Sequence, residues 1–277
     1  MDEGSPLLVY TKKLQEQLKQ EINLPIEIAM RYGNPGIDQA VKSLKEQKIN
    51  KILVLPLYPQ FSDATVTTSL KEVERTCNQD TRLINLPPFY ASEGFLKASE
   101  TVIRENLPKD FEHLLFSYHS LPESQIKKTD PTGHYCLSHE DCCSKESAAS
   151  HLCYRYQSLK TSNLLARSLK LNDKQYTTSF QSKLGPVPWL TPSTEDSLKH
   201  FGNTGIKRLV VACPSFVSDN LETLEEIGER GRQTFLDAGG ESLTLIPCLN
   251  DHPTWIKALS KILLDHSINA ANVVTSE

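Results

Sequence analysis

Short apolar runs alternate along this chain with longer stretches in which apolar residues recur at helical spacing. Residues 52–57 read Ile-Leu-Val-Leu-Pro-Leu, a run typical of a strand that is buried on both faces. Residues 6–22 instead place their leucines and Ile22 on one helical stripe. Strands that alternate with helices predict parallel sheets covered on both faces. The sequence therefore predicts an α/β fold.

The alternation divides into two halves that meet at a Leu-Pro-Lys-Asp turn at 107–110. We expect two doubly wound domains, residues 1–110 and 111–277, with a cleft between them and a Cys-rich insertion at 130–156. The first half offers fewer strands than the second, so we expect the N-terminal domain to be incomplete and to lack its first strand. The expected strands are 26–32, 52–57, 82–86, 113–118, 176–181, 208–213 and 242–247. The expected helices are 6–22, 36–47, 66–76, 93–106, 158–170, 193–203, 219–237 and 253–266.

Charge and hydropathy exclude several classes of function. The 277 residues carry a net charge of −4, which argues against nucleic acid as the main partner because phosphate binding needs a basic face. No apolar run approaches the roughly 18 residues of a membrane span. The start, Met1-Asp2-Glu3-Gly4, has neither the basic nor the apolar part of a secretory signal. We therefore expect a cytoplasmic protein, in which cysteines are more often thiols or metal ligands than disulfides.

A lone histidine ends the apolar run at 115–119, and a Leu-Pro turn follows directly. This places the imidazole of His119 at the carboxyl end of a buried strand, where open α/β sheets hold their ligands. An imidazole titrates near neutrality and can move protons or bind a metal. A packed structural histidine remains the alternative.

Two further sets of residues present flat or cationic side chains at the ends of expected strands or just after them. In one, the Gly/Pro-constrained loop at 182–190 carries Trp189, which suits either stacking on a flat ligand or packing in the core. In the other, Arg31 precedes an Asn-Pro turn and Tyr58 follows the strand at 52–57. An arginine there can meet a ligand carboxylate, and the tyrosine adds flat surface.

A row of acidic residues follows Ser218 and Asp219, either of which can cap a helix. Glu222, Glu226 and Glu229 stand at i, i+4 and i+7, which is one face of a continuous helix. The row predicts either a path for protons or a hard divalent cation, or simply a solvated helix whose acids suit the macrodipole.

Four of the seven cysteines gather between residues 136 and 153, at Cys136, Cys142, Cys143 and Cys153. Thiolates hold zinc or an iron–sulfur cluster. The adjacent pair departs from the Cys-x2-Cys pattern of zinc ribbons and favours iron–sulfur, while nearby histidines keep zinc open. An unmetallated loop is the remaining alternative.

Taken together, these stretches resemble the ferrochelatase family in order and spacing over nearly the whole chain. The matching segments are Gly4-Ser5-Pro6-Leu7, Arg31-Tyr32-Gly33-Asn34-Pro35, Leu57-Tyr58-Pro59-Gln60-Phe61-Ser62, Phe116-Ser117-Tyr118-His119-Ser120-Leu121-Pro122, Phe180-Gln181-Ser182-Lys183-Leu184-Gly185, Pro188-Trp189-Leu190 and Ser218-Asp219-Asn220-Leu221-Glu222-Thr223-Leu224.

The resemblance implies two Rossmann-like domains around a porphyrin cleft and an enzyme that inserts Fe²⁺ into protoporphyrin IX in haem biosynthesis. It implies His119 and Glu222 as the catalytic residues that also meet the Fe²⁺ substrate. It implies an acidic path through Asp219, Glu226 and Glu229. It implies a substrate pocket of Arg31, Tyr32, Tyr58, Gln60, Gln181, Ser182 and Trp189.

The same resemblance implies that the four cysteines hold a [2Fe–2S] cluster, and it leaves open a peripheral contact with the inner membrane. Family members normally carry a further strand, a glycine-containing loop and helices before the Gly-Ser-Pro-Leu segment, which matches the expectation of an incomplete first domain. Two alternatives stay open. One is a chelatase for another tetrapyrrole, such as coproporphyrin III or sirohydrochlorin. The other is a non-catalytic tetrapyrrole-binding iron–sulfur protein.

Overall fold

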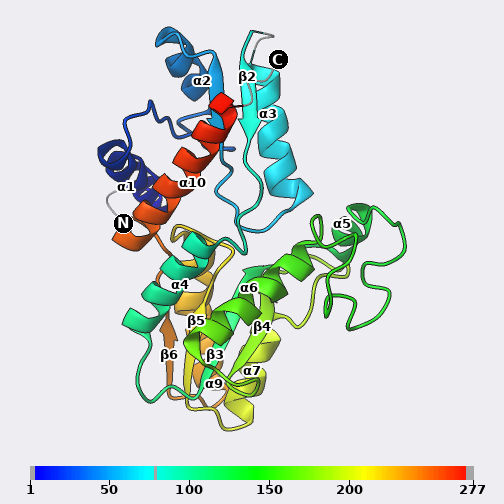
Figure 1. The fold of residues 1–277 in the computed structure, drawn as a ribbon. Helices are drawn as coiled ribbons and strands as arrows, with labels where there is room; N and C mark the ends of the chain where they lie inside the picture. The colour runs from blue at the N-terminus through cyan, green and yellow to red at the C-terminus, as the bar shows by residue number, and fades with distance from the viewer. Residues whose placement is uncertain (1–3, 78–79, 273–277) are drawn as a thin grey trace.

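Two parallel sheets, one small and one large, organise the computed structural model, which describes residues 4–77 and 80–272 (Figure 1). The expected α/β fold is confirmed. The first half contains α1 (Pro6–Glu21), α2 (Ile37–Glu46), β1 (Lys51–Val54), the π-helical turn η1 (Asp63–Thr67), α3 (Thr68–Thr76), β2 (Arg82–Asn85) and α4 (Glu93–Asn106). The second half contains β3 (His113–His119), α5 (Glu123–Lys128), α6 (Tyr154–Leu169), β4 (Tyr176–Gln181), α7 (Thr194–Asn203), β5 (Arg208–Ala212), α8 (Leu221–Leu224), the π-helical turn η2 (Glu226–Gly231), α9 (Arg232–Asp237), β6 (Ser242–Leu245) and α10 (Pro253–Asn272).

The small sheet pairs β1 with β2 in parallel, and a local cluster of Ile37, Val41 and Val73 packs beside it. The strand expected at 26–32 does not form. Met30 makes an isolated bridge with Gly36, and no ladder extends from it in the part of the chain that the structure describes. The side-chain amide of Gln15 in α1 donates to the carbonyl of Ile26 at 2.7 Å. A side chain from a helix therefore takes a backbone acceptor that a neighbouring strand would otherwise use.

The large sheet has the strand order β4-β3-β5-β6, and every pairing in it is parallel. Strand β3 lies inside the sheet with residues 113–118 buried, which explains its near-continuous apolar sequence. The register places His119 opposite Gln181, so β3 and β4 end together. This end of the strands, the carboxyl edge of the large sheet, is where side chains from several strands can meet.

Three helical segments of the structure differ from the helices expected from the sequence. Helix α6 begins at Tyr154 rather than 158, because the sulfur of Cys153 accepts the backbone N–H of Tyr156 and caps the helix. The short helix α5 was not expected from the sequence. The helix expected at 219–237 is three pieces, α8, η2 and α9, with the turn η2 winding more residues into each turn than an α-helix does.

One apolar core connects the two halves, because α10 returns from the second half to pack against α4 and α1 (Figure 1). Trp255 of α10 is fully buried and stacks on Phe89 at 5.7 Å between ring centroids. The two helices approach closely at Gly94, where an added Cβ would lie 2.9 Å from the Cβ of Ala258. Helices from the two halves of the chain therefore pack into one layer.

Candidate active site

His119 is half-buried at the carboxyl edge of the large sheet, and contacts with the loops that follow β3 and β5 fix its orientation. Its Nδ1 lies 2.7 Å from the carbonyl oxygen of Ser120. Because a carbonyl only accepts, Nδ1 carries a proton, which in the neutral form of the ring leaves the lone pair on Nε2. The backbone N–H donates to Ser215 Oγ at 3.2 Å, and the ring of Phe216 meets the imidazole edge-on at 6.4 Å. The structure thus presents an Nε2 that can accept a proton or bind a metal.

A buried amide joins the histidine strand to the acidic helix. Gln181 accepts a hydrogen bond from Ser117 Oγ at 2.7 Å through its Oε1. Its Nε2 donates to the backbone carbonyl of Glu222 at 2.7 Å and to Glu226 Oε2 at 3.3 Å. Gln181 lies opposite His119 in the sheet, so this amide sets where the two carboxylates sit relative to the imidazole.

The two acidic side chains beside Gln181 differ in how firmly they are held. Glu226 is clasped by Ser182, whose backbone N–H donates to Oε1 at 2.7 Å and whose hydroxyl donates to Oε2 at 2.5 Å. Ser182 adopts a left-handed φ of 64°. The described residues offer the half-buried carboxylate of Glu222 no hydrogen-bond partner, so it remains available to a ligand.

The other two residues of the expected acidic path lie in different surroundings. Asp219 is buried and accepts from Asn250 Nδ2 at 2.7 Å, Thr223 Oγ1 at 3.0 Å and the backbone N–H of Cys248 at 3.2 Å. Its carboxylate therefore anchors the start of α8. Glu229 is exposed on η2, where the π-helical winding takes it off the face it would share with the other acids in a continuous α-helix.

Trp189 lies against the segment that leaves His119. It forms an antiparallel bridge with Pro122, and the next residue, Leu190, donates its N–H to the carbonyl of Leu121 at 3.0 Å. The half-buried indole is thereby fixed beside the turn after β3. The structure brings His119, Gln181, Ser182, Trp189, Glu222 and Glu226 to the same carboxyl edge.

The predicted pocket residues of the first half form a second group. The guanidinium of Arg31 lies over the exposed ring of Tyr32, 4.7 Å from its centroid. Burial raises the pKa of the Tyr58 hydroxyl, and the nearby charge of Arg31 acts in the opposite direction. Gln60 is 2% exposed and faces the second half instead of a pocket. Its amide donates to Thr161 Oγ1 and to the carbonyl of Pro214, both in the second half.

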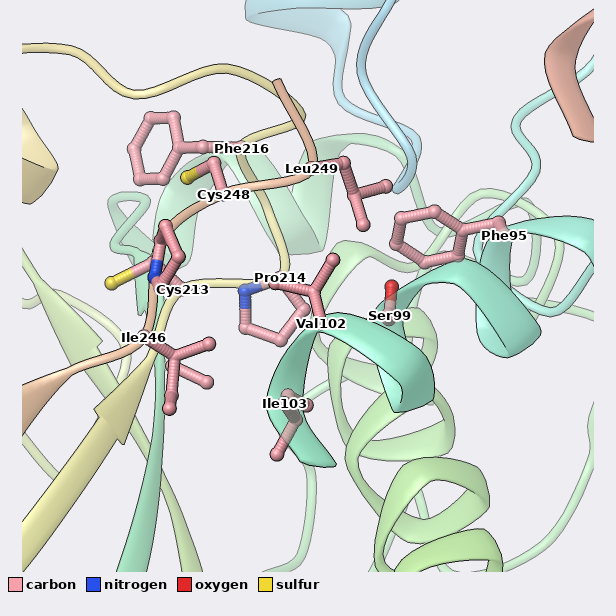
Figure 2. Close-up of a pocket in the computed structure, with 12 residues that line it drawn as sticks. Phe95, Ser99, Val102, Ile103, Cys213, Pro214, Phe216, Ile246, Cys248 and Leu249 are labelled. Atoms are coloured by element: carbon pink, nitrogen blue, oxygen red, sulfur yellow. The ribbon is translucent and has the colours of Figure 1, made fainter. Parts of the chain in front are cut away.

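A small apolar cavity lies behind the carboxyl edge and is separate from His119. It has a volume of about 30 Å³ and lies between α4 and the ends of β5 and β6. Figure 2 shows Phe95, Val102, Pro214 and Leu249 pointing into it. Binding sites for drug-sized ligands are commonly roughly ten times larger, so this cavity is too small for a macrocycle.

The residues between Asp130 and Cys153 form a chain of turns that gathers the four cysteines. Asp130 organises this segment, because its carboxylate accepts the backbone N–H groups of Tyr135 and Cys136, each at 2.7 Å. Burial would raise the pKa of this carboxyl, but the hydrogen bonds from Cys136, Thr132 and Tyr135 outweigh it and hold the pKa well below its usual range.

The four sulfurs lie within one group. Cys142 Sγ and Cys143 Sγ are 3.8 Å apart, and the Cys153 side chain influences the pKa of both the Cys136 and the Cys143 thiol. Two thiolates on one tetrahedral metal, with bonds of about 2.3 Å, are themselves separated by about 3.8 Å. Arg155 Nη1 donates to Cys142 Sγ at 3.5 Å, which suits a thiolate. Burial, followed by the charge of Asp130, raises the pKa of the Cys136 thiol to about 11.

Across residues 4–77 and 80–272, no three His, Cys, Asp or Glu side chains are arranged to hold a single metal ion. A two-iron cluster distributes its four ligands over two irons, so it needs a gathered set of thiols rather than one such trio. The donor set and the close pair therefore fit a cluster of this kind. No helix in the described part of the chain is both long and apolar enough to cross a bilayer.

Several residues around the site were missed by sequence reasoning. Ser117 holds the Gln181 amide, Ser215 holds the backbone of His119, and the Tyr154 hydroxyl donates to the carbonyl of His119 at 2.9 Å. Ser215 follows an expected strand, which was a usable signal. Tyr154 and Ser117 lie inside a helix and a strand, where nothing in a single sequence marks them.

The chain is similar to known proteins both in sequence and in fold. The sequence model of the ferrochelatase family matches residues 1–267. The ferrochelatase of Ectopseudomonas mendocina (strain ymp) is 46% identical over 274 residues, which cover 97% of this chain and 80% of that protein. The ferrochelatase of Pseudomonas fluorescens (strain Pf0-1) is 46% identical over 266 residues, covering 94% and 78%. Among solved structures, SirB from Bacillus subtilis with Fe³⁺ matches in fold, with a TM-score of 0.64, 15% identity, and coverage of 95% of this chain and 90% of that one.

Proposed function

The chain belongs to the ferrochelatase family, and from this premise we propose that it inserts Fe²⁺ into protoporphyrin IX at the carboxyl edge of the large sheet. Its activity is that of a metal-insertion lyase, with iron as the substrate. The choice of protoporphyrin IX and the roles of individual residues are our proposal. We also propose the division into domains at residues 1–110 and 111–277, which the separate sheets on either side of the 107–110 turn support.

One observation carries the proposed mechanism, which is the hydrogen bond from His119 Nδ1 to the carbonyl of Ser120. A porphyrin must lose two pyrrole protons before the metal occupies its centre. An imidazole whose Nε2 lone pair is free accepts such a proton near neutral pH. The contacts with Ser215 and Phe216 hold the ring before substrate arrives, so little reorganisation is needed when the proton moves.

The acidic side chains supply the complementary role. The Glu222 carboxylate is unengaged among the described residues and stands next to the fixed Glu226. Carboxylate oxygens suit a hydrated divalent cation and can also carry protons away. We assign Glu222 to the catalytic step, Glu226 to the path that leads to it, and the exposed Glu229, which lies off the face of the other acids, to the outer end of that path. Asp219 joins the path as its anchor, because it holds the start of α8.

The macrocycle is assigned to the surface between Trp189 and the group of Arg31, Tyr32 and Tyr58. The indole offers a flat apolar face, and the guanidinium suits a propionate carboxylate. Binding that bends the ring and tilts its nitrogens toward the metal would favour the transition state over the flat substrate. Gln60, Gln181 and Ser182 are assigned to shaping this surface, since each is hydrogen-bonded within the protein.

We propose further that Cys136, Cys142, Cys143 and Cys153 hold a [2Fe–2S] cluster. The gathered sulfurs and the N–H groups directed at Cys142 and Cys153 support the assignment. Bound iron would keep these thiols deprotonated despite the burial that raises the pKa of Cys136. Metal insertion changes no oxidation state, so the cluster has a structural or sensing role. Anaerobic reconstitution followed by visible absorption tests the assignment, and a protein without bound iron and sulfide would contradict it.

A cytoplasmic enzyme with peripheral membrane contact completes the proposal. Leu184, Val187 and Leu221 are 78%, 50% and 59% exposed, and they flank Ser182, Trp189 and Glu222 in the sequence. Exposed apolar side chains grouped beside a site favour contact with a membrane surface. Leu184→Gln should weaken sedimentation with lipid vesicles, whereas Leu264→Gln on α10 should not. Equal sedimentation of both variants with vesicles would argue against this face.

Product analysis tests the proposed reaction. The purified chain is supplied anaerobically with Fe²⁺ and, in parallel, with protoporphyrin IX, coproporphyrin III or sirohydrochlorin. We expect loss of porphyrin fluorescence and formation of protohaem to be fastest with protoporphyrin IX. Faster turnover of another tetrapyrrole would assign a different substrate. Tight haem binding without any turnover would favour the non-catalytic binding protein.

A further inference from the structure

The first turns of α6 lie where the cysteine segment, the histidine strand and the first half of the chain meet. Cys153, the last of the four gathered cysteines, caps this helix. Tyr154 is its first residue, and Gln157 stands four positions after Cys153 on the same face. In Figure 1, α6 runs from the long loop of the cysteine segment back across the large sheet. Two buried side chains on these turns reach in different directions.

Tyr154 reaches the catalytic strand. It is buried, and its hydroxyl donates to the backbone carbonyl of His119 at 2.9 Å. The residue that follows a proposed cluster ligand therefore holds the backbone of the proposed proton acceptor.

Gln157 reaches the first half of the chain, and it uses both ends of its amide. Its Oε1 accepts the backbone N–H of Phe61 at 2.6 Å. Its Nε2 donates to the carbonyls of Ser150 and His151, at 3.2 and 2.9 Å, inside the cysteine segment. The side chain is 1% exposed, so a lost partner could not be replaced by bulk water without cost.

A second contact strengthens the same junction. Gln60, beside Phe61, donates to Thr161 Oγ1 at 3.2 Å and to the carbonyl of Pro214 at 3.4 Å. Thr161 lies one turn after Gln157 on α6. The segment from Tyr58 to Ser62, which carries proposed pocket residues, is therefore fixed to α6 rather than to its own sheet alone.

We propose that α6 couples the cysteine segment to the porphyrin site, with Gln157 as the positioning residue for the Tyr58–Ser62 segment and Tyr154 as the positioning residue for His119. The proposal rests on the proposed cysteine ligands and substrate. Ser150 and His151 lie three and two residues before Cys153, so a change in where that sulfur lies moves the carbonyls that accept from Gln157. Binding of the cluster to the cysteine segment and binding of the porphyrin to its site then favour each other.

Coupling of this kind is reciprocal and typically amounts to roughly 5- to 150-fold in affinity. We expect the wild-type protein with its iron–sulfur cluster reconstituted to bind protoporphyrin IX about tenfold more tightly than the cluster-free protein. The dissociation constants are measured by porphyrin fluorescence without Fe²⁺, so no turnover interferes. By the same linkage, bound protoporphyrin IX should raise the chelator concentration that removes half of the cluster at equilibrium in the wild-type protein.

Gln157→Glu separates the two ends of the amide. The variant keeps an oxygen that accepts the Phe61 N–H, but it replaces the donor that faces the Ser150 and His151 carbonyls with a second acceptor. We expect the tenfold difference to fall to within about twofold. Asn163→Asp is the matched control, because it also replaces an amide of α6 with a carboxylate. Among the described residues, the Asn163 side chain has one partner, Tyr176 Oη, which donates to its oxygen at 3.0 Å. The control should keep the full difference.

Three outcomes would overturn the proposal. The first is equal porphyrin affinity of loaded and cluster-free wild-type protein, with no protection of the cluster by porphyrin, which requires no variant. The second is a Gln157→Glu protein that takes up its cluster yet keeps the tenfold difference. The third is a wild-type protein that takes up no cluster, which contradicts the cysteine assignment as well, whereas the first two leave that assignment standing.

Discussion

The amide of Gln181 provides a sharp test of how the site is built. Gln181→Met keeps the length of the side chain but removes the donor to the Glu222 carbonyl and the acceptor for Ser117 Oγ. Ser117 keeps a second partner, Thr194 Oγ1, at 2.8 Å, so the Glu222 carbonyl suffers most. One unsatisfied buried group costs about 1–3 kcal/mol, and a lost hydrogen bond adds about 1 kcal/mol. We expect the free energy of unfolding to fall by about 2–4 kcal/mol.

Urea denaturation followed by circular dichroism measures this loss, and initial rates of Fe²⁺ insertion measure its consequence. Because the amide sets where the two carboxylates sit, kcat should fall by a larger factor than the affinity for protoporphyrin IX, whose binding surface Gln181 also helps to shape. Gln233→Met is the control, since Gln233 is exposed and its amide bonds only Asp237 on the same helix. A Gln181→Met protein with the stability and kcat of the wild type would refute the view that this amide joins strand and helix.

Three further predictions follow from particular contacts. Burial lowers the pKa of His113, so the unfolded chain binds a proton on this imidazole more tightly than the folded protein does. The free energy of unfolding should therefore fall as the pH drops below about 6.5. In His113→Gln, the urea midpoint should depend less on pH between about pH 5 and 7. Gly94→Ala should cost about 1–3 kcal/mol of stability in thermal unfolding, because its Cβ would press on Ala258 of α10, and an unchanged Tm would contradict that close packing. Burial raises the pKa of Cys213 and Cys248, so iodoacetamide should modify them only after unfolding, as peptide mass spectrometry would reveal.

The sequence was most informative where a pattern of residues fits one kind of structural element and few others. A buried parallel strand needs an unbroken apolar run, so β3 and β5 could be located and their carboxyl ends inferred. His119 interrupts such a run, which marked it. The strand at 26–32 was wrong because an apolar stretch can pack against helices as well as pair, and local sequence does not reveal which neighbour takes the carbonyl of Ile26.

The parts that escaped prediction depend on contacts between distant residues. Gln181 was expected among the pocket residues, but the sequence did not indicate that its buried amide would connect residues 117 and 222. Asp219 was expected to cap a helix or to join an acidic path, but the sequence did not indicate that Asn250 and Thr223 would donate to its carboxylate. The row of acids through Glu229 assumed a continuous helix, and the π-helical winding of η2 cannot be read from helical spacing. In each case a polar side chain was recognised, but its partner was not.

The most direct test of the account separates proton acceptance by His119 from porphyrin binding. Wild-type and His119→Ala proteins are compared in anaerobic Fe²⁺ insertion and in binding of protoporphyrin IX without metal. The account predicts that the variant binds the porphyrin nearly as well as the wild type while insertion is almost abolished. Insertion at close to the wild-type rate by His119→Ala would show that the imidazole at the end of β3 is not the proton acceptor.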